Sequence, residues 1–242
     1  MRFEHLAETD STNEEAKRRA LAGETGPVWI RADRQTAGRG RRGRRWSGGA
    51  GNLYATGLYR LETQPAKAAQ LSFAAALAVA DVAAAAGVDP ERITLKWPND
   101  VLVDGRKTAG VLLESGNAPG GGLWLGVGVG INLVDHPEDA ERPATDLAAH
   151  GRALEPDAAL RVLADSFDAW RRRWAEHGFA PVRDAWLARA HGLGGTCVAR
   201  LEDETVEGVF ADLTSEGALR LDLKDGRRRF ISAGDIFFPS AR

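Results

Sequence analysis

The chain contains a single cysteine, Cys197, among its 242 residues. One cysteine excludes a disulfide within the chain and any zinc site built on Cys-x-x-Cys pairs. The five histidines are scattered without His-Glu-x-x-His spacing, so no dedicated metal site is expected. Neither a Gly-x-Ser-x-Gly nucleophile motif nor a Walker A loop occurs, which excludes two common classes of hydrolase and nucleotide-binding protein.

Targeting and membrane signals are also absent from the sequence. Residues 1–5 show no charged start followed by an apolar core, so no secretory signal is visible. The most apolar stretch, residues 68–88, is interrupted by Gln70 and Asp81, and its apolar side chains recur on only part of a helical circumference. We therefore expect a buried amphipathic helix rather than a membrane span, and the cytoplasm as the default compartment.

The chain has no overall excess of positive charge, but it has one strongly basic segment. Its 32 Lys and Arg are balanced by 34 Asp and Glu, which gives a net charge of -2 and a pI of about 6.2. Five arginines nevertheless alternate with glycines in residues 35–46, Gln-Thr-Ala-Gly-Arg-Gly-Arg-Arg-Gly-Arg-Arg-Trp. Glycine lets backbone N–H groups approach a ligand, and arginine offers forked donors to phosphate or carboxylate oxygens. The segment predicts a clamp for a small anion, while a nucleic-acid-binding run or a solvated surface stay as alternatives.

Local patterns predict a chain of alternating helices and strands. A helix with a capped start is expected within residues 10–21, further helices are expected at 68–86, 156–177 and 180–190, and residues 135–146 are expected to form a mobile loop. Strands are expected at 28–32, 52–59, 93–97 and 123–133, with 101–103 and 107–113 joined by the turn Asp104-Gly105. Short alternating strands at 196–201, 205–213, 219–223 and 227–231 predict a small β-barrel. We thus expect a large domain over residues 1–191 and a small one over 192–242.

Four further polar segments are ambiguous when each is taken alone. Residues 10–13, Asp-Ser-Thr-Asn, are typical of a helix cap, and Lys107 lies on a strand where lysine usually faces solvent. Residues 96–100, Lys-Trp-Pro-Asn-Asp, follow a strand and are rarely needed for packing. Asn132 ends a strand that contains Gly126, Gly128 and Gly130, whose spacing differs from Gly-x-Gly-x-x-Gly and indicates close backbone approach.

Taken in order, these segments resemble the biotin protein ligase family. The resemblance rests on residues 10–13, on 38–44, on 96–100, on Lys107-x-x-Gly110-x-Leu112-x-Glu114 and on Gly128-x-Gly130-Ile131-Asn132. It implies an α+β fold in which helices pack on a central mixed or antiparallel sheet, as in class II aminoacyl-tRNA synthetases, with a C-terminal SH3-like barrel. The sequence starts almost directly at the catalytic core, so we expect a monofunctional ligase without the DNA-binding domain of the bifunctional repressors.

The resemblance also implies an activity. ATP would convert biotin to biotinyl-5′-AMP with release of pyrophosphate, Mg²⁺ would accompany the ATP, and a lysine of a biotin carboxyl carrier protein would then accept the biotinyl group. Lys107, Arg41 and Arg39 would be catalytic. The biotin site would comprise Ser11, Thr12, Asn13, Gln35, Gly38, Arg39, Gly40, Arg41, Lys107, Gly110, Gly128 and Gly130. The adenylate site would comprise Arg41, Arg42, Arg44, Trp46, Asn99, Lys107, Ile131 and Asn132.

Three rival functions and two further expectations accompany this interpretation. A lipoate ligase or lipoyl/octanoyl transferase has a related fold, a nucleic-acid-binding module could use the same arginines, and a biotin-responsive regulator is a third alternative. Because a mixed anhydride must be shielded from water and later opened to an amine, we expect residues 38–46 to be poorly ordered without ligand and ordered with it. The resemblance also implies dimerisation through the central sheet, which is common in the family. No feature of the sequence itself indicates it.

Overall fold

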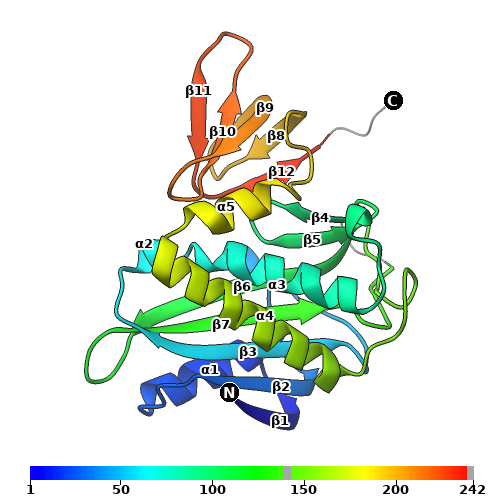
Figure 1. The fold of residues 1–242 in the computed structure, drawn as a ribbon, viewed down its shortest axis with the longest axis vertical. Helices are drawn as coiled ribbons and strands as arrows, with labels where there is room; N and C mark the ends of the chain where they lie inside the picture. The colour runs from blue at the N-terminus through cyan, green and yellow to red at the C-terminus, as the bar shows by residue number, and fades with distance from the viewer. Residues whose placement is uncertain (139–142, 239–242) are drawn as a thin grey trace.

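A seven-stranded mixed sheet forms the centre of the computed structural model, which describes residues 1–138 and 143–238 (Figure 1). The first two strands are parallel and every other neighbouring pair is antiparallel, which confirms the expected mixed sheet. In spatial order the strands are β1 (Arg2–Thr9), β2 (Val28–Gln35), β3 (Leu53–Leu61), β7 (Leu123–Ile131), β6 (Arg106–Asn117), β5 (Asp100–Val103) and β4 (Ile93–Lys96).

The sequence predicts the β5–β6 hairpin, whose turn residues are recognisable, but it does not predict the edge strand β1. Asp104 and Gly105 both have positive φ, 50° and 72°, as the predicted tight hairpin between β5 and β6 requires. Strand β1 was not predicted, because its residues lie at the sheet edge and are exposed or half-buried without clear alternation. Of the predicted mobile loop at 135–146, residues 139–142 lie outside the described residues.

Helices cover the two faces of this sheet unequally. Helices α3 (Leu71–Ala85) and α4 (Pro156–His177) cross one face, in front of the sheet in Figure 1, while α1 (Thr12–Leu21) packs against β3 and β7 on the other. The short helices α2 (Pro65–Ala68) and α5 (Ala180–Leu187) complete the set. Since α1 covers only part of its face, the rest of that face is open to a ligand.

The predicted helix at 68–86 is found as α3, which begins at Leu71 after a turn at residues 69–70 that separates it from α2. Helix α3 lies between the sheet and α4 and is buried on nearly its whole circumference rather than on one face. Residues 65–85 form the one helical stretch, within the part of the chain that the structure describes, that is long and apolar enough to cross a membrane, and 72% of its most apolar window is buried in the protein. That burial is what a core helix of a folded domain shows.

A second sheet follows at the C-terminus, at the top of Figure 1. Its five antiparallel strands lie in the order β11 (Arg228–Ile231), β10 (Leu219–Asp222), β9 (Thr205–Leu213), β8 (Thr196–Arg200) and β12 (Asp235–Phe237). The predicted closed barrel is not found, because β11 and β12 remain unpaired edges within the described residues. The three-residue strand β12 was not predicted.

The two sheets are joined by buried contacts and share one hydrophobic core. Trp97 is 3% exposed and its Nε1 donates a hydrogen bond to the Gly217 carbonyl at 3.1 Å. Gln70 Nε2 donates to the Ser215 carbonyl at 3.1 Å. The expectation that residues 96–100 are rarely needed for packing is therefore wrong for Trp97, which holds the C-terminal sheet in place.

Candidate functional site

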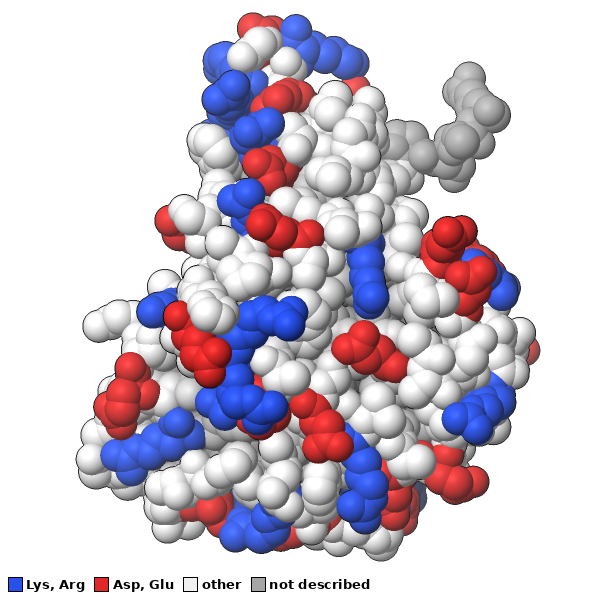
Figure 2. All heavy atoms as spheres, viewed as in Figure 1, with Lys and Arg blue, Asp and Glu red and all other residues white. Residues whose placement is uncertain are grey.

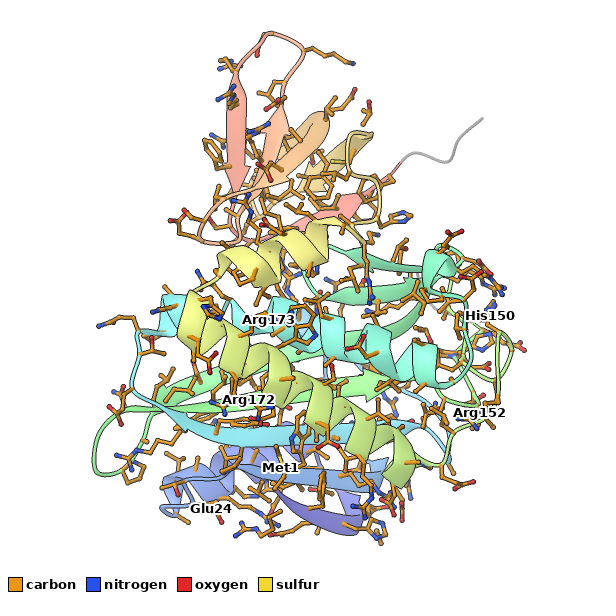
Figure 3. All side chains as sticks on the ribbon, viewed as in Figure 1. Met1, Glu24, His150, Arg152, Arg172 and Arg173 are labelled. Atoms are coloured by element: carbon orange, nitrogen blue, oxygen red, sulfur yellow. The ribbon has the colours of Figure 1, made fainter. Side chains whose placement is uncertain are left out.

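A cavity of about 310 Å³ lies on the face of the large sheet that α1 only partly covers. This volume is at the lower end of the range of small-molecule sites. The opposite face, shown in Figure 2, carries acidic and basic side chains intermixed rather than in patches of one sign. Arg172 and Arg173, labelled in Figure 3, belong to α4 on that opposite face and take no part in the cavity.

Fifteen of the eighteen residues predicted for the site line this one cavity. They are Ser11, Thr12, Asn13, Gln35, Arg39, Gly40, Arg41, Arg44, Trp46, Asn99, Lys107, Gly110, Gly128, Gly130 and Asn132. The other three, Gly38, Arg42 and Ile131, do not line it. Ile131 is fully buried in the core on the α3 side, and the Gly38 carbonyl accepts the Trp46 N–H at 3.0 Å. The structure thus brings together segments that are more than a hundred residues apart.

The start of α1 forms a neutral polar wall. Ser11 occupies the N-cap position of α1, as predicted. Its hydroxyl, however, makes no hydrogen bond to the backbone N–H groups of the first turn. Ser11 and Thr12 are each 4% exposed. Gln35 Oε1 accepts the backbone N–H of Thr12 at 2.8 Å, which fixes the Gln35 amide beside the helix start. These three residues therefore offer hydroxyl and amide groups without a formal charge.

Asn13 is held by hydrogen bonds on both ends of its amide. Its Nδ2 donates to Glu114 Oε2 at 2.7 Å and to the Leu112 carbonyl at 3.2 Å, and its Oδ1 accepts from Thr56 at 2.6 Å. A Cβ on Gly128 would collide with this amide. The glycine is needed for close approach, as predicted for this strand, but the group that approaches is a protein side chain.

The arginine-glycine segment is a compact loop that is tied to both sheets. Arg39 pairs with Glu14 and, at 3.2 Å, with Glu114. Arg44 Nη2 lies 2.8 Å from both carboxylate oxygens of Asp235, at the start of β12. Arg41 donates to the Gly234 carbonyl at 3.3 Å, and burial lowers the pKa of Arg41 despite the nearby Asp235 carboxylate.

Trp46 and Lys107 form the floor of the cationic end. The Trp46 ring lies over Gly130 and Gly110, where a Cβ on either glycine would crowd it. Its Nε1 is buried without a hydrogen-bond partner among the described residues. Lys107 Nζ lies 5.3 Å from the centroid of this ring and 2.5 Å from Asp100 Oδ1. A Cβ on Gly130 would lie 2.5 Å from this Nε1, so the unpaired donor faces the strand beneath the ring.

Two asparagines brace the far side of the cavity. Asn99 Nδ2 donates to the Val111 carbonyl at 2.6 Å, and Asn132 Nδ2 donates to the Thr145 carbonyl at 3.0 Å. Both amides therefore fix backbone segments as well as line the cavity. No group of three or more His, Cys, Asp or Glu side chains is placed to hold a metal within residues 1–138 and 143–238.

Two functional residues escaped the sequence analysis. Asp235 joins the arginine loop from a different sheet, and no spacing rule connects residues so far apart. Thr56 lies in the middle of β3 and is fully buried. In the sequence nothing distinguishes it from any other threonine of a strand. Asp100 was noticed in its motif but not assigned to the site, although it is the ion-pair partner of Lys107.

The cavity thus combines a neutral polar end with a cationic end. Arg41, Arg44 and Lys107 are within the same cavity as the polar wall of Ser11, Thr12 and Gln35. Such a site suits an elongated ligand that has a hydrogen-bonding ring at one end and an anionic group at the other.

Comparisons with known proteins agree with this geometry. The model of the biotin/lipoate A/B protein ligase family matches residues 6–132, and that of the biotin protein ligase C-terminal domain matches residues 192–238. The chain is 42% identical, over 96% of its length and 99% of the relative's, to a biotin--[acetyl-CoA-carboxylase] ligase of Paracoccus denitrificans. A ligase of the same name from Mycobacterium tuberculosis is 35% identical, over 96% of this chain and 86% of the relative.

A solved structure shares the whole architecture. The biotin protein ligase of Aquifex aeolicus in complex with biotin and ATP aligns with a TM-score of 0.83 and 27% identity, over 98% of this chain and 97% of that one.

Proposed function

The chain belongs to the biotin/lipoate A/B protein ligase family, and we propose that it activates biotin with ATP and transfers the biotinyl group to a carrier protein. The observation that carries this proposal is the single cavity in which the polar wall, Lys107 and the arginine loop meet. The 42% identity to a named biotin ligase favours biotin over lipoate as the acid.

In the first step a carboxylate oxygen of biotin attacks the α-phosphorus of ATP, and the bond to pyrophosphate breaks. Two anions must approach each other, so their repulsion opposes both binding and attack. Lys107 would act as a point cation between the carboxylate and the α-phosphate, and Arg41 and Arg44 would neutralise the phosphates. We propose that the Asp235 carboxylate, which holds Arg44 in the free enzyme, yields it to the triphosphate.

In the second step the amine of an acceptor lysine attacks the acyl carbon of biotinyl-5′-AMP, AMP leaves, and the new amide loses a proton to solvent. The polar wall would hold the ureido ring, because a buried urea needs its donors and acceptors satisfied. Trp46 would leave its place on Gly110 and Gly130 to close over the adenylate and exclude water until the acceptor arrives.

Magnesium is proposed to arrive with the triphosphate. Asn99 and Asp100 carry the hard oxygen ligands that Mg²⁺ prefers, and both line the cavity. When bound, Mg²⁺ would neutralise phosphate charge. An ion delivered by its nucleotide needs no all-protein cage.

Five further statements extend this proposal. We propose that the acceptor is a biotin carboxyl carrier domain of a carboxylase, that the enzyme works in the cytoplasm, and that it binds neither DNA nor membranes. Residues 1–191 would form the ligase domain and residues 192–242 the smaller domain. A homodimer through the central sheet is also proposed, and sedimentation velocity with and without biotin and ATP would test it.

The decisive experiment is ATP-dependent transfer to a purified carrier domain. Biotin transfer would be followed by streptavidin blot, and pyrophosphate release would be measured with biotin and with lipoate. We expect both signals with biotin and neither with lipoate. Pyrophosphate release with lipoate alone would identify the lipoate activity instead, and steeply salt-dependent DNA binding without biotin activity would identify the nucleic-acid-binding alternative.

A further inference from the structure

Thr56 lies directly behind the polar wall and does not itself line the cavity. It is fully buried on β3, and its hydroxyl contacts two wall residues at once. Thr56 Oγ1 is 2.6 Å from Asn13 Oδ1 and 2.9 Å from Thr12 Oγ1. A hydroxyl has one proton, so it donates to one of these atoms and accepts at the other.

The surroundings of Asn13 decide which way this proton points. Asn13 Nδ2 is identified by its two partners, the Glu114 carboxylate and the Leu112 carbonyl, since both can only accept. The atom facing Thr56 is therefore the amide oxygen, which also can only accept. Thr56 must donate its proton to Asn13.

The hydroxyl of Thr12 is fixed as a consequence. At 2.9 Å from Thr56, two oxygens without a proton between them would repel, so Thr12 donates to Thr56. Gln35 Oε1, which accepts the Thr12 backbone N–H at 2.8 Å, has a second lone pair and lies 3.2 Å from Thr12 Oγ1, so it is a second and more distant acceptor for the same proton. The Thr12 proton thus stays inside the protein, and its oxygen presents only lone pairs to the cavity.

We propose that Thr56 is a positioning residue that makes Thr12 a hydrogen-bond acceptor and so selects ligands with an N–H donor at this end of the cavity. This inference rests on the proposed function, in which the ligand is a cyclic urea with two N–H groups. One N–H of the ring donates to Thr12 Oγ1. In an analogue with an oxygen in place of this N–H, the lone pairs of that oxygen would face the lone pairs of Thr12 Oγ1 and repel them.

The test uses three variants and two analogues. Thr56→Val removes the hydroxyl and keeps the shape, whereas Thr56→Ser keeps the hydroxyl. Thr94→Val is the matched control, because Thr94 lies on β4 and its Oγ1 is buried without a hydrogen-bond partner in the described part of the chain. Calorimetry would measure Kd for biotin and for two cyclic carbamates, each with one ureido N–H replaced by oxygen.

In the wild type we expect one carbamate to bind at least about tenfold more weakly than biotin. Thr56→Val should weaken biotin by about fivefold to twentyfold, but that carbamate by less than about twofold, so the preference shrinks. KM for biotin should rise while KM for ATP stays constant. Thr56→Ser and Thr94→Val should keep the wild-type preference.

Three outcomes would overturn the proposal. They are a wild type that binds both carbamates as well as biotin, a Thr56→Val variant with unchanged preference, and a variant in which all three ligands weaken equally. The first needs no variant and stands even if Thr56→Val does not fold. A wild type that binds no biotin would contradict the proposed function itself.

Discussion

Lys107 is held in place by two neighbours before any ligand arrives. Its Nζ pairs with Asp100 at 2.5 Å and faces the Trp46 ring at 5.3 Å, so the ammonium group points into the cavity rather than to solvent. A cation that is already oriented needs little rearrangement when negative charge develops on the reacting oxygens. The expectation that a lone strand lysine usually faces solvent does not apply here.

Replacing Lys107 by Ala should therefore depress adenylate formation by about 10²-fold or more. Biotin-dependent pyrophosphate release measures this step directly. Lys224→Ala is the control, since Lys224 is a lysine of the exposed C-terminal hairpin that pairs with Glu207 at 2.8 Å. A wild-type rate of pyrophosphate release in Lys107→Ala would remove this residue from the chemistry.

The glycines of β7 offer a matched pair of substitutions. A Cβ at Gly128 would collide with the Asn13 amide, whereas at Gly126 the nearest atom would be at 3.6 Å, an ordinary contact. Gly128→Ala must displace Asn13 from Thr56 and Glu114 and should cost about 1–3 kcal/mol of stability, together with weaker biotin binding. Thermal melting and biotin titration of both variants would check this. Equal effects of the two substitutions would show that strand propensity, not the Asn13 contact, explains the loss.

At the scale of elements, the arginine loop is anchored by the strand that the sequence analysis missed. Asp235 of β12 receives Arg44 at 2.8 Å, with Arg42 at 3.6 Å and Arg41 at 3.9 Å. Three cations on one carboxylate hold the loop against the second sheet. We therefore expect the order of residues 38–46 in the free enzyme to depend on this counter-ion, with which a triphosphate would compete.

Trypsin, which cleaves after arginine, would test this anchor. Asp235→Asn should raise the rate of cleavage within residues 38–46 of the ligand-free protein by about fivefold, the effect of losing about 1 kcal/mol of ion-pair energy. Biotin with ATP should protect the loop. Asp225→Asn is the control, because Asp225 pairs with Arg227 in the exposed hairpin of the same sheet. Cleavage that is the same in both variants, with and without ligand, would contradict both the anchor and the expected ordering.

The sequence predicts a structural feature well when neighbouring residues determine it, and poorly when distant residues do. The β5–β6 hairpin was predicted because Asp104 and Gly105 carry their own turn chemistry. Strand β1 and the three-residue β12 were missed because they are edge strands whose pairing is decided by distant partners. Most cavity residues were found through ordered motifs, whereas Thr56 and Asp235 act only through contacts that the folded chain creates.

At the scale of the whole molecule, the two sheets behave as one folded body. Trp97, which follows β4, and Gln70, which precedes α3, donate hydrogen bonds to backbone carbonyls between β9 and β10, and the core runs without a break from one sheet to the other. Because Asp235 belongs to the second sheet, the position of that sheet sets the position of the arginine loop. Any change that loosens the junction should therefore affect the site.

We expect His191 to make this junction sensitive to acid. Its ring packs edge-on against Phe238, and its backbone N–H donates to the Leu95 carbonyl at 2.8 Å. Burial, with a contribution from Lys96, lowers the pKa of His191 below its ordinary value. The unfolded chain therefore takes up a proton before the folded chain does, so the stability from neutral His191 is complete above about pH 6.5 and is lost as the pH falls below it.

We expect the melting temperature of the wild type to fall between pH 7 and pH 5.5, and His191→Gln to remove part of that fall. His177→Gln is the matched control, because His177 is an exposed histidine at the end of α4. Calorimetric melting of the three proteins across this range measures the difference. The same slope in wild type and His191→Gln would show that protonation elsewhere governs the acid sensitivity. A slope reduced in His191→Gln alone would place the acid-labile contact at the junction that holds Asp235 against the arginine loop.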